Sequence, residues 1–365
     1  METKKRDDNF DIMKGIGIIA VVACHCDCWF GYFTAFHLPI FMFICGYFHP
    51  TKDADSISDI WKILKKRYVQ LGIPLLIFSV IFILLQPLFV YFHWLPAPAH
   101  SISVLSKNLI LSVGSLGILR LPLLIIPLWF TVLALLNCLF FEILRYLLRL
   151  FLQGKARIIA NIIICIALYS LGCILIAKYQ YLGAYINYIG STFMLYPYFI
   201  SGHYLHKIIG MRSLSDIFRL KSTIFFGVIS LVGLLVISYP GLMWKSPEKP
   251  VITIVFCFLG ILNTICFARI LEMLSIHCIF SYIGRISYMI MVWHLCGFKL
   301  LASVLFLVGF IDITKLESYP APDFSGDSYF FKIVFTFLFC LSGVFIPVLI
   351  QEIRKILFRR KPHEL

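Results

Sequence analysis

Apolar runs, most of them about as long as a bilayer-spanning helix, follow one another along nearly the whole of this 365-residue chain. They fall at residues 12–29, 33–49, 71–92, 122–145, 158–177, 183–205, 222–240, 251–272, 286–310 and 329–351. A transmembrane helix needs about 20 mainly apolar residues. The pattern therefore predicts an all-α polytopic membrane protein with about ten transmembrane helices.

Composition agrees with this class. Hydrophobic residues make up 61% of the chain and charged residues only 14%, whereas a soluble domain carries about a quarter charged residues. The 32 Lys and Arg exceed the 18 Asp and Glu, an excess that either nucleic-acid binding or basic cytoplasmic loops would explain. The bases gather in alternate loops, near residues 52–67, 145–157, 207–221 and 354–361. The positive-inside rule therefore favours cytoplasmic loops, with both termini in the cytoplasm and no nucleic-acid partner.

Two longer segments, residues 93–121 and 311–328, fall on the outer side in this topology. They either cover a cavity or simply connect helices. The first apolar run resembles a signal peptide in its basic start. Asp11 directly before it, Lys14 inside it and the lack of a small-residue cleavage site after it favour a retained helix.

Asp11 directly precedes this first run, and Lys14 and His25 are ionisable residues within it. Ionisable groups within the hydrocarbon layer are expensive and usually functional. His25 follows Lys14 by eleven positions, almost three helical turns, so the two share one face about 16 Å apart. The spacing predicts a site that holds an anionic group near Lys14 and performs proton chemistry at His25.

Each of these residues also has a purely structural interpretation. Lys14 can extend toward the headgroups, and His25 or His294 can be a hydrogen-bonded core histidine. Lys299 is expected to extend toward the outer surface. The run Cys24-His25-Cys26-Asp27-Cys28 invites a metal interpretation, but its alternating positions point to different faces of a helix. No metal is expected, since buried cysteine usually behaves as a small hydrophobe.

Two motifs resemble those of the type-three integral membrane acyltransferases. The first, a basic residue followed by ten residues and His, corresponds to Lys14 and His25. The second, a Phe-x-x-x-Pro-x-Phe-x-Phe-x-Ser-Gly-Tyr run, is similar to residues 35–47. Weaker similarities occur at Lys66-Arg67 with Pro74, at Leu128-Trp129-Phe130, and at residues 286–294, so the motifs extend from residue 6 to about residue 300. Two residues depart from the usual pattern: Lys14 replaces the more common Arg, and Cys45 replaces Ser.

The resemblance implies a single acyltransferase domain over residues 1–365, with a basic cytoplasmic tail at 352–365, in a bacterial plasma membrane. It implies transfer of an acetyl group from acetyl-CoA, or another acyl-CoA, to a hydroxyl of a cell-envelope sugar or polysaccharide precursor. The implied catalytic residues are His25, Lys14, Asp11 and His37. The implied donor-binding residues are Lys14, Lys65, Lys66 and Arg67, and the acceptor-binding residues are His37, Tyr47, Trp129 and His294.

Two other classes of function remain open to the sequence. A glycan or small-molecule transporter would also place ionisable residues in its helices, usually together with inverted repeats, and none is detectable here. A catalytically silent scaffold of an envelope-assembly complex would leave the alignment of Lys14 with His25 unexplained.

Overall fold

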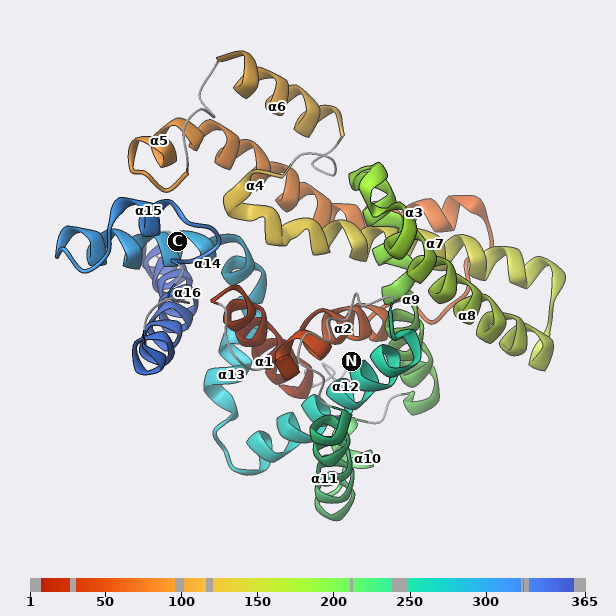
Figure 1. Ribbon diagram of the computed structural model, residues 1–365. Helices are drawn as coiled ribbons and strands as arrows, with labels where there is room; N and C mark the ends of the chain where they lie inside the picture. Colours follow the sequence, from red (N-terminus) through yellow and green to blue (C-terminus); the bar gives the residue numbers. More distant parts are fainter. Residues whose placement is uncertain are drawn as a thin grey trace, which may run out of the picture.

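A computed structural model of the chain describes residues 8–26, 31–95, 102–115, 121–210, 213–237, 248–322, 324 and 328–357 (Figure 1). Within these ranges the regular structure is entirely helical. The elements are α1 (Asp8–His25), α2 (Gly31–Tyr47), α3 (Ile57–Arg67), the π-helix η1 (Tyr68–Gly72), α4 (Ile73–Leu84), α5 (Gln86–Tyr91), α6 (Ile102–Gly114), the 3-10 helix η2 (Leu123–Leu128), α7 (Trp129–Phe151), α8 (Gly154–Tyr179), the 3-10 helix η3 (Gln180–Leu182), α9 (Ala184–Ile209), α10 (Leu214–Ile217), α11 (Leu220–Ile237), α12 (Pro250–Met273), α13 (His277–Arg285), α14 (Ser287–Leu307), α15 (Ile313–Glu317) and α16 (Tyr329–Leu357).

The first helix lies at the centre of the bundle (Figure 1), packed against α2, α12, α13, α14 and α16. Its apolar side chains are buried on several faces, as Ile12, Met13, Ile18 and Val22 show. A helix that is apolar all round is a buried helix. The charged and titratable residues of α1 are therefore held by protein on most sides.

Glycines bring the central helices into close contact. A methyl group added at Gly46 of α2 would run into the carbonyl of Phe199 on α9, and one at Gly284 of α13 into the carbonyl of Asp11 on α1. Small residues allow the backbones of two helices to approach closely. Within a membrane this close packing matters because the lipid is as apolar as the helix surfaces, so apolar burial does not drive helices together. The contact of α13 with α1 thereby fixes the turn that carries Asp11 and Lys14.

Six helices are long and apolar enough to cross a membrane: Ile57–Leu84, Leu123–Phe151, Gly154–Tyr179, Pro250–Met273, Ser287–Leu307 and Phe330–Ile356. Shorter apolar helices cover Phe36–Tyr47, Val104–Gly114 and Leu220–Val236. Large apolar side chains are exposed along α8, α11 and α16, as expected of helices that face lipid. The predicted all-α membrane class is thus confirmed for the part of the chain that the structure describes, while the count of about ten spans stays a prediction.

The helix ends depart from the predicted spans mainly at prolines. The expected run at 71–92 divides into η1, α4 and α5, with Pro74 in the first turn of α4 and Pro87 in that of α5. The expected run at 122–145 starts as η2, which contains Pro127, and continues as α7 to Phe151. Proline lacks the backbone N–H that donates within a helix, so the first turn of an element, where that N–H has no partner in the helix, is a favoured position for it.

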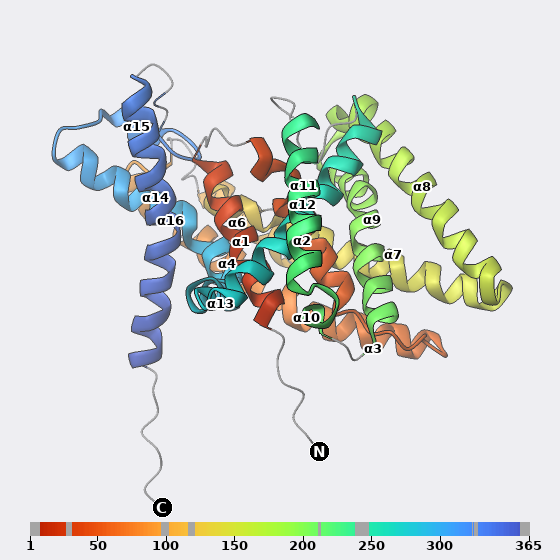
Figure 2. The ribbon, with the colours of Figure 1, turned by 90° about the horizontal axis from the view of Figure 1, so that it is seen from below.

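The other departures concern termini and connections. Helix α1 ends at His25, and residues 27–30, with Asp27 and Cys28, lie outside the described residues. The outer segment 93–121 contains helix α6, while its residues 96–101 and 116–120 are not described. Residues 352–357 of the predicted tail belong to α16. The first turn of α1 and the last turn of α16 lie on the same side of the molecule (Figure 2).

Arginines hold the connection between α2 and α3, residues 48–56. Arg157 donates two hydrogen bonds to the Asp53 carboxylate, at 2.6 and 3.0 Å. Arg145 and Arg149 donate at 2.7 to 3.1 Å to the backbone carbonyls of Pro50, Lys52 and Ala54. Helices α7 and α8 therefore fix the path of the chain from α2 into α3.

Candidate active site on the first helix

The N-terminal end of α1 carries a paired lysine. Lys14 Nζ lies 3.2 Å from Asp11 Oδ1 and 5.6 Å from the centroid of the Phe48 ring, a cation–π distance. Arg67 Nη2 donates to the backbone oxygen of Phe48 at 2.6 Å. The structure thus brings Asp11, Lys14 and Arg67 together around Phe48.

Tyr47 lies at this same end of α1. Its buried ring stacks on His206 with centroids 4.7 Å apart and lies 4.2 Å from the ring of Phe10. Of the three consecutive bases at the end of α3, Arg67 contacts Phe48, whereas Lys65 and Lys66 are exposed. Sequence reasoning missed Phe48, although it directly follows the Cys45-Gly46-Tyr47 motif.

His25, the last residue of α1, lies against His294 of α14. The two ring centroids are 5.3 Å apart at an interplanar angle of 34°. His25 is half-buried, and His294 is completely buried. The structure therefore joins two imidazoles that are far apart in the sequence.

Backbone carbonyls determine the tautomer of His294. Its Nδ1 lies 3.0 Å from the oxygens of both Ile290 and Met291. A carbonyl only accepts, so Nδ1 must carry the proton and Nε2 of the neutral ring must be the acceptor. This Nε2 is buried and has no hydrogen-bond partner among the described residues. A substrate hydroxyl is the kind of donor that would satisfy it.

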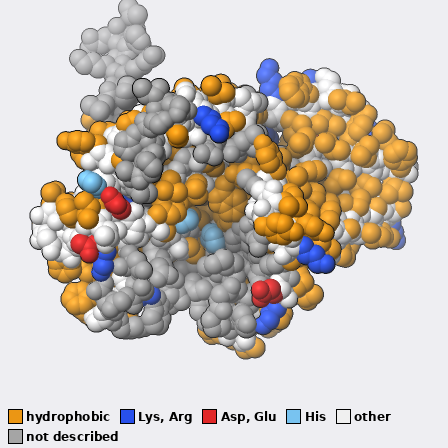
Figure 3. Space-filling view, turned by 45° about the horizontal axis from the view of Figure 1, so that its top comes forward, with side chains coloured by type: hydrophobic (Ala, Val, Ile, Leu, Met, Phe, Trp, Pro, Cys, Tyr) orange, Lys and Arg blue, Asp and Glu red, His pale blue; other side chains and the backbone are white. Residues whose placement is uncertain are grey.

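A cavity of about 420 Å³ opens beside His25. It is lined by Cys24, His25 and Cys26 of the α1 end, by Lys332 and Thr336 of α16, and by Tyr319, Pro320, Ala321, Pro322 and Phe324. Small-molecule sites occupy about 300 to 1,000 Å³. One face of the molecule shows histidine side chains at the bottom of a hollow with apolar side chains around it (Figure 3).

We call residues 313–322 the wall segment, because its last four residues, 319–322, line this cavity. Lys299 of α14 is completely buried and donates to the backbone oxygens of Leu316, at 2.7 Å, and Ser318, at 2.6 Å. The expectation that Lys299 extends toward the surface is therefore wrong, because wall carbonyls replace water around the ammonium. His93 Nδ1 also lies 2.9 Å from Glu317 Oε1, within hydrogen-bond distance. The segment 311–328 was expected either to cover a cavity or to connect helices. Its central part lines this cavity.

Two predicted site residues lie elsewhere in the helices. His37 is half-buried on α2, and Trp129 begins α7 and packs partly against the apolar core. Their roles stay predictions. Within the described ranges no group of three or more His, Cys, Asp or Glu side chains could hold a metal ion.

The fold and the site define an all-helical polytopic membrane protein in which one central helix carries a basic residue at one end and a cavity-lining histidine at the other. A family model described as an acyltransferase domain matches residues 7–352, nearly the whole chain. The chain belongs to the acyltransferase 3 family and is a membrane O-acyltransferase. The resemblance seen in the Lys14 and His25 motif is confirmed, and an acyltransferase takes precedence over a transporter or a silent scaffold. Neither a curated protein nor a solved structure matches the chain.

Proposed function

We propose that this acyltransferase moves an acetyl group from acetyl-CoA to a hydroxyl of a cell-envelope sugar or polysaccharide precursor, in the plasma membrane of a bacterial cell. The observation that carries the proposal is the position of His25, which lines the cavity and lies 5.3 Å from a second imidazole, that of His294. A neutral imidazole beside a cavity can take a proton from a hydroxyl.

The proposed topology has about ten transmembrane helices with both termini in the cytoplasm. The start of α1 and the end of α16 lie on the same side of the molecule, which supports placing both termini on one side of the membrane (Figure 2). Lys14 then lies near the cytoplasmic surface, and His25 lies about 16 Å deeper. The pantetheine arm of CoA, when extended, has a comparable length.

Donor binding follows from the charges at the Lys14 end. Lys14 and Arg67 converge on Phe48, and fixed cations attract the phosphates of an acyl-CoA. Lys65 and Lys66 add positive charge at the same end of α3. The Asp11 carboxylate, 3.2 Å from Lys14 Nζ, holds the lysine in place.

His25 acts as a general base in the proposed reaction, rather than as a covalent acyl carrier. Its imidazole takes the hydroxyl proton while the acceptor oxygen attacks the thioester carbonyl. The new C–O bond forms, the C–S bond breaks, and the imidazolium returns the proton to the leaving thiolate. The His294 Nε2 holds the acceptor by accepting a hydrogen bond from a hydroxyl, and His37 is a reserve candidate for proton transfer or acceptor binding.

Labelled acetyl-CoA tests the proposal. Purified protein in lipid, given membranes that contain the glycan acceptor, should release CoA and label the glycan. His25→Ala should lower this transfer by about 10²- to 10⁴-fold, the usual contribution of a general base, without changing the melting temperature much. His277→Gln, at the start of α13, is the matched control and should transfer normally.

Normal transfer by the His25→Ala protein would exclude His25 as the base. Label that remains on the protein, and disappears in His25→Ala, would instead indicate a covalent acyl-histidine. Turnover of acetyl-CoA without glycan labelling would refute the proposed acceptor.

A further inference from the structure

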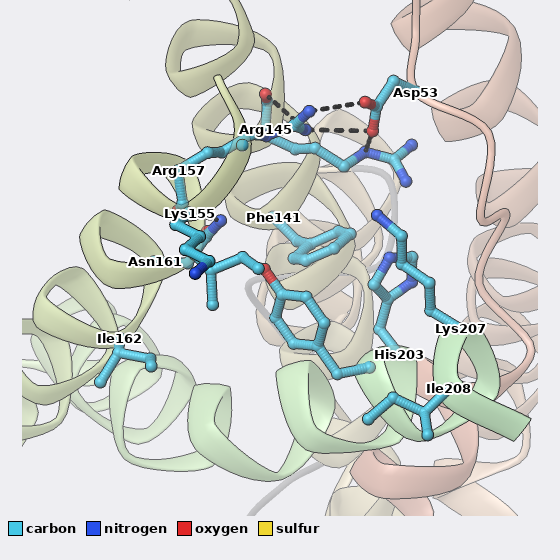
Figure 4. A pocket seen from close by; sticks show the side chains of 13 residues that line it. Asp53, Phe141, Arg145, Lys155, Arg157, Asn161, Ile162, His203, Lys207 and Ile208 are labelled. Carbon is cyan, nitrogen blue, oxygen red and sulfur yellow. Dashed lines mark hydrogen bonds and ion pairs between the residues drawn. The ribbon is translucent and has the colours of Figure 1, made fainter. Parts of the chain in front are cut away.

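A second cavity, of about 810 Å³, lies between α7, α8, α9 and the connection that follows α2 (Figure 4). Its polar lining comes mainly from Asp53, Arg145, Lys155, Arg157, His203 and Lys207. None of these residues takes part in the proposed acyl transfer. The charge pattern places this cavity on the cytoplasmic side.

The charges of this cavity are only partly neutralised. Arg157 is paired with Asp53, and Arg145 Nη2 lies 2.7 and 2.9 Å from the two carboxylate oxygens of Glu142. Burial raises the pKa of Asp53, but its hydrogen bonds to Arg157 and the charges of Arg157, Arg145 and Lys207 hold that pKa below its ordinary value. No ion pair is found for Lys155 or Lys207 with any described residue. The cavity is therefore basic even though Asp53 is ionised.

A buried histidine also lines the cavity without a partner for one nitrogen. His203 is only 4% exposed and lies with its ring 4.7 Å from that of Phe141. Its Nδ1 is buried and has no hydrogen-bond partner in the described part of the chain. A buried polar nitrogen without a hydrogen-bond partner is unfavourable for the folded protein. In the tautomer that carries its proton on Nδ1, this nitrogen would donate to a ligand that accepts hydrogen bonds.

The remaining lining is apolar and continues beyond the cavity. Ile158 and Ile162 of α8 line it, and Ile166 follows one turn later on the same face. These three side chains are 50%, 55% and 62% exposed. An apolar stripe thus leads from the basic cavity along a helix that is long and apolar enough to cross a membrane.

We infer that this cavity binds the phosphate of an anionic membrane lipid. The phosphate oxygens lie among Lys155, Lys207 and His203, and an acyl chain follows the stripe Ile158, Ile162 and Ile166. A soluble phosphate compound, such as CoA or inorganic phosphate, would satisfy the same cations. The stripe favours a lipid, because only an amphipathic ligand uses both parts of the site.

Lipid binding to the purified full-length protein, measured by native mass spectrometry, tests this inference. The probes are phosphatidylglycerol, zwitterionic phosphatidylcholine, CoA and inorganic phosphate. Lys155→Gln with Lys207→Gln should weaken phosphatidylglycerol binding by about 30-fold, since each lysine near a membrane surface contributes about fivefold. Arg219→Gln with Lys221→Gln removes two exposed bases that do not line the cavity, and this control should bind normally. His203→Leu should weaken binding several-fold with both lysines present.

Equal phosphatidylglycerol binding by both double variants would overturn the inference. So would loss of CoA or phosphate binding in Lys155→Gln/Lys207→Gln with phosphatidylglycerol binding intact, because the site would then serve a soluble ligand. The expected result is that Lys155→Gln/Lys207→Gln binds phosphatidylglycerol more weakly and binds phosphatidylcholine as the unchanged protein does. The melting temperature of each variant shows whether the protein has folded, and His203→Leu tests the site independently of the lysines.

Discussion

Replacing Lys299 by Met should release the wall segment from α14. The side chain is completely buried and donates to the Leu316 and Ser318 oxygens at 2.7 and 2.6 Å. A hydrogen bond from a charged group contributes about 1.5 to 3 kcal/mol, and an unpaired buried carbonyl is unfavourable by about 1 to 3 kcal/mol. Burying the ammonium opposes part of this gain. The substitution should therefore reduce the free energy of opening of the wall segment by about 2 to 4 kcal/mol. This reduction corresponds to an increase of about 30- to 700-fold in the equilibrium constant for opening.

Hydrogen exchange of residues 313–322 measures this opening directly, and acetyl transfer measures its effect on the cavity beside His25. The Lys299→Met protein should exchange these amides faster by that factor, up to the unprotected limit, and should show a lower kcat/KM. Lys299→Arg, which keeps the charge and the donors, should restore part of the protection. Lys178→Met is the control, because Lys178 is exposed at the far end of α8. Unchanged exchange in Lys299→Met would refute the role of Lys299 in holding the wall.

Three further predictions concern α1 and its partners. His294→Asn keeps a donor near the position of Nδ1 but loses the Nε2 acceptor. It should therefore lower kcat more than His294→Gln does, while the two variants have similar melting temperatures. Equal activity of the two variants would argue against a role for Nε2. Lys14→Gln should raise the KM for acetyl-CoA by about tenfold, the value of one charge-assisted contact, while Lys14→Arg should not; a normal KM in Lys14→Gln would separate Lys14 from donor binding. Gly284→Ala forces a methyl against the Asp11 carbonyl and should destabilise the protein by about 1 to 3 kcal/mol, whereas Gly114→Ala, which meets open space, should leave thermal unfolding almost unchanged.

Local sequence relations predicted the parts of the site that lie on one helix. Asp11 and Lys14 are three residues apart and form an ion pair, and His25 lies on the same continuous helix. The all-helical class followed from the length and composition of the apolar runs. Helical periodicity determines such relations without any knowledge of the other helices.

Relations between helices were not predictable in this way. The pairing of His25 with His294 depends on how α1 packs against α14, and many packings are compatible with apolar helices that show little preference for a face. Lys299 was misjudged for the same reason, because the carbonyls that receive it belong to a segment whose path the sequence does not determine. The spacing of Lys14 and His25 alone suggested a site without identifying its reaction. The resemblance to the acyltransferase motifs indicated which reaction that site performs.

The connection at residues 48–56 shows how misleading composition can be for experimental design. Its sequence, with Pro50, Lys52, Asp53 and Asp55, has the polar character of a linker that tolerates insertions. Three arginines of α7 and α8 nevertheless hold its backbone and its Asp53 carboxylate. A topology reporter or epitope tag inserted there would disturb both the lipid cavity and the path into α3, so its signal would report a damaged protein rather than a side of the membrane.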